Sequence, residues 1–457
     1  MLIRKLISPD HLYHRRTKFT LSSYFQPFDT VPHNQTNPGG GPEESVSARL
    51  MTSYGVVRPA GPGTFHLLPL GLRAQNKLEA LIDRELEVAG CQKISMPHLT
   101  PASLWRTSGR LEMMGSELMR LRDRQERPLV LAPTHEEAVT NILASLPVTS
   151  ERDLPVKLYQ IGTKFRDEMR PKFGLLRANE FRMQDLYTFD RDLRAAEETY
   201  QVVSEAYQRI FARLGVPWVR VRGDCGAMGG QVSHEYHFPA NIGQDSLVLC
   251  QKCGSGANLE LGETQVCPVQ EPGCGGASLS SRGIEVAHTF LLGEKYSKPA
   301  KATFRTERGQ SLPLQMGCFG IGVSRVLAAS LEVLSSPTEL RWPRAIAPFS
   351  LIILAPKKGS KEAQAGALVE EIHSRAAQIF PSDVMLDDRE KLTVGRKLRE
   401  AKKTGYPLIV LFGKKCVDSQ PRLELHHLNT GNMLELSPGE LLSRLAREGE
   451  DDDSGTP

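Results

Sequence analysis

The amino-acid sequence predicts an α/β protein in which a larger α+β domain precedes a smaller α/β domain. Two strand patterns of period two, over 156–166 and 178–189, indicate the larger domain, and a loop joins them as antiparallel neighbours. After Trp342 the hydrophobic pattern changes to short apolar runs that alternate with helical stretches, which indicates the smaller domain. We therefore expect a domain boundary near residue 344.

The other elements follow in order along the chain. Apolar residues recur at helical spacing from Leu72 to Ala89, and Gly90 stands where a helix commonly ends. A short strand over 92–96 stops at Pro97, because proline has no N–H to donate to a ladder. In the smaller domain we expect strands at 350–354, 384–386 and 408–412, and helices around 361–379 and 395–404.

Both ends of the chain and one internal stretch differ from the rest. Residues 1–28 contain five lysines and arginines against the single acid Asp10, and they resemble a mitochondrial transit peptide. A disordered basic tail is the alternative. Residues 29–63 are rich in Pro, Gly, Asn and Ser and are typical of a linker. Residues 447–457 are acidic and polar, which predicts a disordered tail.

Composition excludes several classes of protein. Of the 457 residues, 40% are hydrophobic and 24% charged, which is typical of a globular protein with a sizeable core. The longest apolar runs are far below the roughly 20 residues that a membrane span needs. The eight cysteines come without a secretory signal, so a disulfide framework is not expected. Because the formal net charge is only +4, a polyanion partner must be indicated by local charge.

The predicted strand pair carries side chains that suit a nucleotide. Lys164 and Arg166 share a face of one strand, and Phe181 and Asp185 share a face of the other. Buried charge is costly unless it is paired, so such a face indicates a ligand surface. Arg166 offers a guanidinium for an α-phosphate, Phe181 a π-face for a purine and Glu168 an acceptor for a base edge. Surface ion pairs are the alternative.

A second segment suits a terminal phosphate. Gly317, Gly320 and Gly322 permit close backbone approach at the end of a strand, and Arg325 enters the helix that follows. Tight packing of that helix on the strand is the alternative, because a lone Gly-x-Gly is a weak signal. The combination of this segment with the strand pair favours a nucleotide site.

In this order, the helix and strand that end at Pro97, the 166–181 segment and the glycine segment resemble motifs 1, 2 and 3 of the class II aminoacyl-tRNA synthetases. The resemblance covers about 60–335. It implies the antiparallel sheet of that class, flanked by helices, with motif 1 at the interface of a homodimer. It also implies ATP, with Mg²⁺, as a substrate.

The same resemblance implies roles for five residues. Arg166 would contact the α-phosphate and the substrate carboxylate, and Arg325 would contact the γ-phosphate, so both would be catalytic. Glu168 would meet the adenine edge and Phe181 the purine ring. Arg177, at the end of the motif 2 loop, would bind the outer phosphates.

The segment 131–137 indicates which amino acid is activated. Thr134 and Glu136 lie where a strand ends and a helix begins, and they resemble the Thr-x-Glu loop of prolyl-tRNA synthetases. There the Glu136 carboxylate would take the ammonium group of proline, and the Thr134 hydroxyl would contact the same substrate. Independently of that resemblance, Thr134 and Glu137 have the spacing of a capping box, which leaves Glu136 free.

Further segments resemble bacterial-type prolyl-tRNA synthetases, namely 169–177, 183–187, 233–236 and 283–288. The resemblance implies that Asp185, His234 and His288 line the proline pocket together with Arg166. For each of the two histidines, a hydrogen-bonded core residue is the alternative. Two positions depart from the family pattern: Ala287 stands where glycine is usual, and His135 replaces the usual serine of the Thr-x-Glu loop.

Residues 344–446 resemble the anticodon-binding domain of this subclass, in 386–389, 395–398 and 405–408. The implied partner is tRNA(Pro). Local charge agrees with an RNA partner, because nine cations stand against Glu390 and Glu400 between 389 and 415. These cations are Arg389, Lys391, Arg396, Lys397, Arg399, Lys402, Lys403, Lys414 and Lys415. A solvated helix face is the alternative.

An insert over about 250–280 lies within the predicted catalytic domain, 64–343. Typical bacterial relatives carry an editing domain between motifs 2 and 3, and the stretch from Asp185 to Gly317 leaves no room for one. Instead the insert holds Cys250, Cys253, Cys267 and Cys274, which could bind a structural zinc ion in tetrahedral geometry. Free thiols in a loop are the alternative, because the last spacing is longer than usual.

The sequence thus predicts a proline–tRNA ligase of the short form, working in the mitochondrial matrix. Two alternatives remain: a synthetase of the same subclass for another amino acid, and a non-catalytic synthetase-like accessory subunit. The second would have no need of Arg166, Glu168, Phe181 and Arg325 together.

Overall fold

The computed structural model describes residues 18–28, 45–147, 149–261, 267 and 274–454, with the backbone alone for 451–454. The chain divides into two compact units, a larger one of residues 29–335 and a smaller one that joins 1–28 to 336–456. Among the described helices, none combines the length and the apolar character that crossing a bilayer requires.

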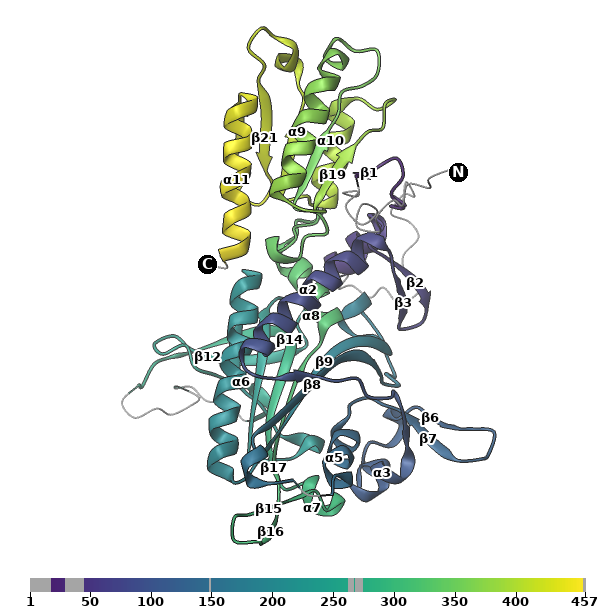
Figure 1. Ribbon diagram of the computed structural model, residues 1–457, viewed down its shortest axis with the longest axis vertical. Helices are drawn as coiled ribbons and strands as arrows, with labels where there is room; N and C mark the ends of the chain where they lie inside the picture. The colour runs from purple at the N-terminus through teal and green to yellow at the C-terminus, as the bar shows by residue number, and fades with distance from the viewer. Residues whose placement is uncertain (1–17, 29–44, 148, 262–266, 268–273, 455–457) are drawn as a thin grey trace, which may run out of the picture. The chain divides into compact units, whose positions relative to one another are not determined.

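The larger unit is built on a nine-stranded sheet in its described part, in the order β11-β10-β13-β12-β14-β17-β9-β8-β4, and β11 also pairs with β14 (Figure 1). The strands are β4 (Gln92–Lys93), β8 (Val156–Phe165), β9 (Glu180–Asp190), β10 (Val219–Arg222), β11 (Val232–Pro239), β12 (Asp245–Cys250), β13 (Gly256–Asn258), β14 (Ser278–Gly293) and β17 (Gln315–Ile321). The predicted antiparallel pair is confirmed, with Lys164 opposite Phe181 and Gln160 opposite Asp185.

Three helices cover one face of this sheet, which we call the back face. They are α2 (Pro69–Val88), α6 (Leu193–Leu214) and α8 (Val323–Leu334). Helix α6 begins where Asp192 accepts a hydrogen bond from the N–H of Ala195 and ends at Gly215, whose φ is 64°. The predicted helix end at Gly90 is confirmed by a φ of 72°, whereas Leu72 is 46% exposed and lies outside the buried stripe.

The opposite face, which we call the front face, packs against shorter elements (Figure 1). They include α3 (Ala102–Thr107), α4 (Arg110–Met113), α5 (Glu136–Ser145), α7 (Ser297–Ala300) and the small sheet of β5 (Leu99–Pro101), β6 (Arg120–Arg122) and β7 (Pro128–Leu131). Val139 and Leu143 of α5 bury their side chains against Tyr187, Phe290 and Met316 of the sheet. Two hairpins complete the unit: β2 (Val57–Gly61) with β3 (Thr64–Leu67), and β15 (Thr303–Arg305) with β16 (Ser311–Pro313).

The smaller unit has a six-stranded sheet in the order β1-β19-β18-β20-β21-β22. Its elements are β1 (Phe19–Thr20), β18 (Leu351–Leu354), α9 (Gly366–Ile379), β19 (Val384–Asp387), α10 (Val394–Thr404), β20 (Leu408–Leu411), β21 (Leu423–His427), β22 (Met433–Leu436) and α11 (Pro438–Ser454). The central strands are parallel and fully buried, as expected for apolar runs between helices. The predicted small α/β unit is confirmed.

The described part of the predicted transit peptide belongs to the smaller unit. Residues 19–20 pair in parallel with β19, and the Phe19 ring stands edge-on to the Phe349 ring at 5.1 Å. The Ser22 N–H and hydroxyl both donate to Asp388. Composition alone did not reveal this strand, because its partners lie more than 300 residues away along the chain. The prediction of a transit peptide over residues 1–17 lies outside the described residues.

Three other sequence-based boundaries differ from the structure. Residues 46–53 of the predicted linker form helix α1 (Val46–Ser53), capped by Ser45, and 57–61 form β2. The smaller unit begins at 336 rather than 344, because the indole N–H of Trp342 donates to the carbonyl of Thr404. Helix α11 continues into the predicted acidic tail, where the buried Glu448 pairs with Arg344 at 2.5 Å. In each case a capping or pairing contact overrides a polar composition.

We expect removal of residues 1–28 to destabilise the smaller unit relative to removal of residues 1–17. The longer deletion exposes the edge of β19 and the ring of Phe349, which should lower the free energy of unfolding by about 2–4 kcal/mol. Urea unfolding, with hydrogen exchange of β18 and β19 as the local readout, measures the difference. Equal midpoints for the two deletions would contradict the assignment of residues 18–28 to this fold.

Candidate active site

The front face gathers charged side chains at its centre. Register places Gln160, Asp185, Gly320 and His288 side by side across β8, β9, β17 and β14. The predicted sharing of one face by Gln160, Lys164 and their partners on β9 is therefore confirmed. The neighbouring positions Tyr187, Cys318 and Phe290 lie on the same face.

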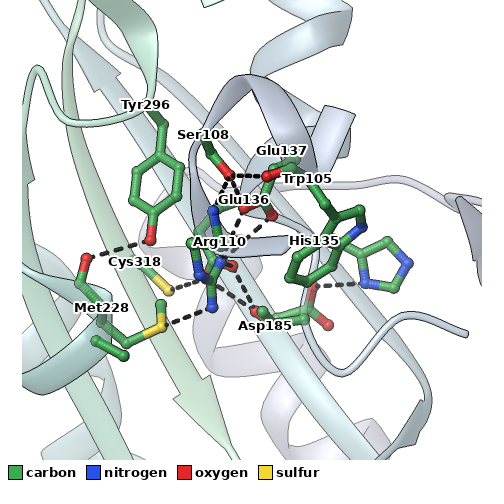
Figure 2. Close-up of polar contacts among 12 residues, drawn as sticks. Trp105, Ser108, Arg110, His135, Glu136, Glu137, Asp185, Met228, Tyr296 and Cys318 are labelled. Carbon is green, nitrogen blue, oxygen red and sulfur yellow. Dashed lines mark hydrogen bonds and ion pairs between the residues drawn. The ribbon is translucent and has the colours of Figure 1, made fainter. Parts of the chain in front are cut away.

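A buried guanidinium between two buried carboxylates closes this face (Figure 2). Arg110 Nη1 lies 2.9 Å from an oxygen of Glu136 and 3.2 Å from one of Glu137, and all three side chains are at most 3% exposed. The Thr134 hydroxyl donates to Glu136 at 2.8 Å, and the Cys318 thiol donates to it at 3.0 Å. Each polar atom of Glu136 is thus engaged, as a fully buried carboxylate requires.

The predicted capping box is wrong. His135, and not Thr134, is the N-cap residue of α5, and no side chain caps the helix there. Glu137 accepts hydrogen bonds from Ser108 Oγ at 2.7 Å and from Arg110. The Glu137 carboxylate, which the spacing assigned to capping the helix, therefore binds Arg110 instead, 27 residues earlier in the chain.

The two glutamates differ in charge preference. Burial alone raises the pKa of Glu136, but Arg110 and the hydrogen bonds from Cys318 and Thr134 outweigh it and lower that pKa. Burial raises the pKa of Glu137, and the nearby Glu136 charge adds to this against the opposing pull of Arg110. Of the two carboxyls, Glu136 therefore holds its negative charge more readily than Glu137 does.

Aromatic and sulfur groups hold Arg110 in place. Its guanidinium carbon lies 5.1 Å from the ring centre of Trp105 and 5.6 Å from that of Tyr296. Its Nη2 lies 3.2 Å from the sulfur of Met228 (Figure 2). Sequence reasoning missed Arg110, since the stretch around it looks like an exposed polar turn. The only available signal in the sequence was the pair of adjacent glutamates at the start of a helix, since two buried carboxylates need a positively charged partner.

A second buried ion pair lies beside the first. Lys164 Nζ is 2.6 Å from Asp185 Oδ1, and both side chains are at most 2% exposed. Lys164 also donates to His135 Nδ1 at 2.9 Å, which leaves Nε2 to donate to the carbonyl of Pro97. Burial and the Lys164 charge lower the pKa of His135 to about 4, so this ring is neutral. The Asp185 charge, assigned by sequence to the proline pocket, is already compensated by Lys164.

Two arginines, Arg166 and Arg325, lie near each other at one end of the front face, and Arg325 pairs with Glu285 at 3.6 Å. The Arg166 guanidinium lies 5.2 Å from the ring centre of Phe181. Within the residues that the structure describes, no group accepts a hydrogen bond from that guanidinium. Burial and the neighbouring Arg325 charge lower the pKa of Arg166. Two close, like-charged groups of this kind favour an anionic ligand.

Arg325 and Glu285 form the wall of this anion site. Arg325 donates to the carbonyls of Leu176 and Glu285, each at 3.0 Å, which fixes its side chain. Burial alone raises the pKa of Glu285, but hydrogen bonding to His288 and the Arg325 charge bring it to about 2. The Glu285 carboxylate is therefore ionised beside the two arginines.

Glu168 and Arg177 pair with each other. Arg177 contacts one Glu168 oxygen through Nε at 2.8 Å and through Nη2 at 2.7 Å, and Nη1 donates to Gln244. Both side chains are partly exposed, at 19% for Glu168 and 40% for Arg177. The motif 2 loop thus brings together the two polar residues that sequence assigned to opposite ends of ATP.

His234, which the resemblance assigned to the proline pocket, lies on the opposite face of the sheet from Asp185 and His288. His234 stands opposite Thr289 on the back face, where its Nδ1 lies 2.8 Å from the Tyr200 hydroxyl of α6. Burial and nearby arginines lower the pKa of His234 to about 4. Side chains alternate along a strand, so the front-facing residues of this segment are Ser233 and Glu235. His288, by contrast, lies on the front face, hydrogen-bonded to Glu285 at 2.9 Å.

Away from the front face, four cysteine thiols gather at the tip of the β12–β13 ribbon. The sulfur atoms of Cys250, Cys253, Cys267 and Cys274 all lie within 4.8 Å of one another. The cluster predicted from their spacing is therefore formed in space, and it has the donor set of a metal site.

Two family models match the chain. A model described as "tRNA synthetase class II core domain (G, H, P, S and T)" matches residues 119–334, and one described as "Anticodon binding domain" matches residues 351–448. The first match falls in the larger unit and the second in the smaller unit.

Similar proteins are found in animals and bacteria. A Mus musculus protein named "Probable proline--tRNA ligase, mitochondrial" is 44% identical over 93% of this chain and 91% of its own. A Sulfurimonas denitrificans protein named "Proline--tRNA ligase" is 37% identical over 81% of this chain and 88% of its own.

Solved structures show the same fold. The prolyl-tRNA synthetase of Giardia lamblia, in complex with prolyl-adenylate, has a TM-score of 0.73 at 19% identity, covering 89% of this chain and 80% of its own. That of Cryptosporidium parvum, with L-proline and AMP, has a TM-score of 0.71 at 17% identity, covering 94% and 81%.

We expect Glu136→Gln and Glu137→Gln to differ sharply in stability. Glutamine mimics a protonated carboxyl, so Glu137→Gln should cost less than about 1 kcal/mol, while Glu136→Gln leaves Arg110 without its charged partner and should cost about 3 kcal/mol. Urea unfolding at neutral pH measures both values. Equal costs would show that the two carboxyls share the charge evenly.

Proposed function

Because the chain belongs to the class II prolyl-tRNA synthetases, it is a proline–tRNA ligase, and we propose the following roles for its residues. L-Proline and ATP form prolyl-adenylate on the front face, and the prolyl group then passes to the 3′ end of tRNA(Pro). The observation that supports the adenylate site is the pair of neighbouring, partly buried arginines, Arg166 and Arg325, with Arg166 over the ring of Phe181.

In the first step a carboxylate oxygen of proline attacks the α-phosphorus of ATP, and the bond to pyrophosphate breaks. The step needs orientation and neutralisation of charge rather than a protein base. We assign Arg166 to the α-phosphate and the proline carboxylate, and Arg325 to the γ-phosphate. The purine would stack on Phe181 in place of the Arg166 guanidinium that now lies over it.

Mg²⁺ supplies further neutralisation of the ATP phosphates when it is bound. Glu285 suits it, because a carboxylate with a pKa of about 2 stays ionised at the arginine end of the site. Glu168 and Arg177, which pair with each other, are assigned to the adenine edge and the outer phosphates. Both side chains reach solvent, so the pair can separate at modest cost.

Proline recognition is assigned to Thr134 and Glu136, with His288 on the same face. The ammonium group of proline would approach the ionised Glu136, whose position Arg110 fixes. Asp185 contributes indirectly, since it holds Lys164 and His135 beneath this loop. We also propose that fidelity rests on this pocket alone, because α6 and β10 to β14 occupy the chain between β9 and β17. Such a pocket can reject slightly smaller amino acids by a few kcal/mol at best.

The smaller unit is proposed to bind the anticodon arm of tRNA(Pro). Not all nine predicted cations are free for RNA: Lys397 is fully buried against backbone carbonyls, and Arg389 pairs with Asp387 and Glu400. Arg399 and Lys403 are exposed on one side of α10, and neither forms an ion pair in the described part of the chain. They carry the proposed RNA contact.

We also propose that the protein works as a homodimer in the mitochondrial matrix. The basic residues Arg4, Lys5, Arg15 and Arg16 and the mitochondrial names of its mammalian relatives support the location. The 1–17 deletion should then fail to enter mitochondria while keeping its fold. The dimer rests on the resemblance of 72–97 to motif 1, and sedimentation as a monomer would refute it.

We expect Arg166→Ala to reduce proline-dependent ATP–pyrophosphate exchange by about 10²–10³-fold without loss of fold. Arg152→Ala is the matched control, because Arg152 is 82% exposed and pairs only loosely with Glu307 at 3.5 Å. Exchange measured with proline, threonine and glycine also separates the two alternative functions. Near-normal exchange in Arg166→Ala would contradict the proposed role of this arginine. No exchange with proline in the unaltered chain would contradict the catalytic assignment.

We expect the double variant Arg399→Glu and Lys403→Glu to raise KM for tRNA(Pro) at least about tenfold and to leave ATP–pyrophosphate exchange unchanged. Charge reversal repels the phosphates of the tRNA, whereas adenylate formation does not involve the smaller unit. Arg375→Glu, an exposed charge reversal on α9, is the control. Unaltered aminoacylation in the double variant would place the RNA contact elsewhere.

A further inference from the structure

The four-cysteine cluster is not used by the proposed reaction. Cys250 ends β12, Cys253 lies in the turn before β13, and Cys274 lies shortly before β14. The Cys250 and Cys274 sulfurs are 3.6 Å apart, and so are those of Cys253 and Cys267. These separations are far above the roughly 2.05 Å of a disulfide bond, so the thiols are close without being bonded.

The separations match the ligands of one tetrahedral ion. A zinc–sulfur bond of about 2.3 Å sets the edges of a sulfur tetrahedron at about 3.8 Å. Two pairs lie at 3.6 Å, and every pair lies within 4.8 Å. An iron–sulfur cluster distributes its thiolates over several iron atoms and would hold them farther apart. We propose that Cys250, Cys253, Cys267 and Cys274 bind a single zinc ion as four thiolates.

The backbone around the thiols is shaped for close approach. Gly254, with a φ of 72°, turns the chain after Cys253, and its N–H donates to the carbonyl of Cys250 at 3.0 Å. At Gly276 a Cβ atom would lie only 2.6 Å from the Cys250 sulfur, so any other residue there would displace that sulfur. Two glycines therefore let the Cys250–Cys253 turn and the start of β14 converge on one point.

Polar neighbours suit a cluster that carries negative charge. Four thiolates with one Zn²⁺ leave a net charge of about −2, which hydrogen-bond donors must offset. The Ser255 hydroxyl lies 2.8 Å from the Cys253 sulfur and 3.4 Å from the Cys267 sulfur. Lys252 brings its ammonium group to the carbonyl of Cys274 at 2.8 Å.

The ion would fix a part of the sheet that reaches the front face. Strand β13 has only three residues, and it joins β12 to β10. Its last residue, Asn258, donates to Glu235 at 3.0 Å, and Glu235 contacts His237 at 2.7 Å. The zinc is thus structural: it closes the ribbon that holds Asn258 against Glu235. This inference does not depend on the proposed roles in aminoacylation.

Metal analysis of the untagged chain, purified without chelators, tests the site. We expect about one zinc per chain, falling below about 0.2 in Cys253→Ser and in Cys267→Ser. Cys225→Ser, outside the cluster, is the matched control and should keep its zinc. Cobalt substitution should give thiolate-to-cobalt charge-transfer bands in the unaltered chain and the control only.

Release of zinc by a thiol-modifying reagent gives a second readout that needs no variant. We expect one zinc to leave as four thiols react, together with faster hydrogen exchange in β10 and β13. A purified chain with no bound metal would overturn the proposal. Iron in place of zinc, or retention of zinc in both Cys253→Ser and Cys267→Ser, would overturn it as well.

Discussion

The buried contact between Arg110 and the two glutamates is the constraint around which the larger unit is arranged. A guanidinium and two carboxyls are costly to bury unless their donors and acceptors are largely matched. Here Arg110 Nη1 meets both carboxyls and Nη2 meets the Met228 sulfur, while Nε has no hydrogen-bond partner among the described residues. Helix α4 supplies the cation, the start of α5 supplies both acids, and β17 supplies the Cys318 thiol. Because these elements come from three distant parts of the chain, the cluster fixes the front face before any substrate arrives.

Both faces of the sheet bury apolar side chains, and the front face buries charged clusters in addition. The back face buries aromatic rings, with Tyr207 of α6 lying 6.3 Å from Phe319. The front face buries the Lys164–Asp185 pair next to the Arg110 cluster. Rigid packing behind the strands therefore positions the polar groups in front, which is what preorganised charge stabilisation requires.

The sequence allowed residues within short motifs to be predicted, but not the contacts between residues that are far apart in the chain. Arg166 and Arg325 could be chosen as candidates because each sits in a short motif with its own glycines or aromatic ring. His234 was misplaced because spacing along a strand does not reveal which of two faces a residue takes until the register is known. Arg110 was missed because its partners lie 26 and 27 residues away. The sequence predicted the four-cysteine cluster, but the proposal of a single ion rests on the separations between the sulfur atoms.

The first strand of the chain has a consequence for how the molecule is made. β1 leaves the ribosome before any other described part of the chain, yet its partner β19 is made only after the whole larger unit. The smaller unit therefore cannot finish folding until β19 and the elements after it have been synthesised, and until then β1 has no partner strand. Closing such a long-range contact is slow compared with local folding. The two units would thus mature at different times, the catalytic one first.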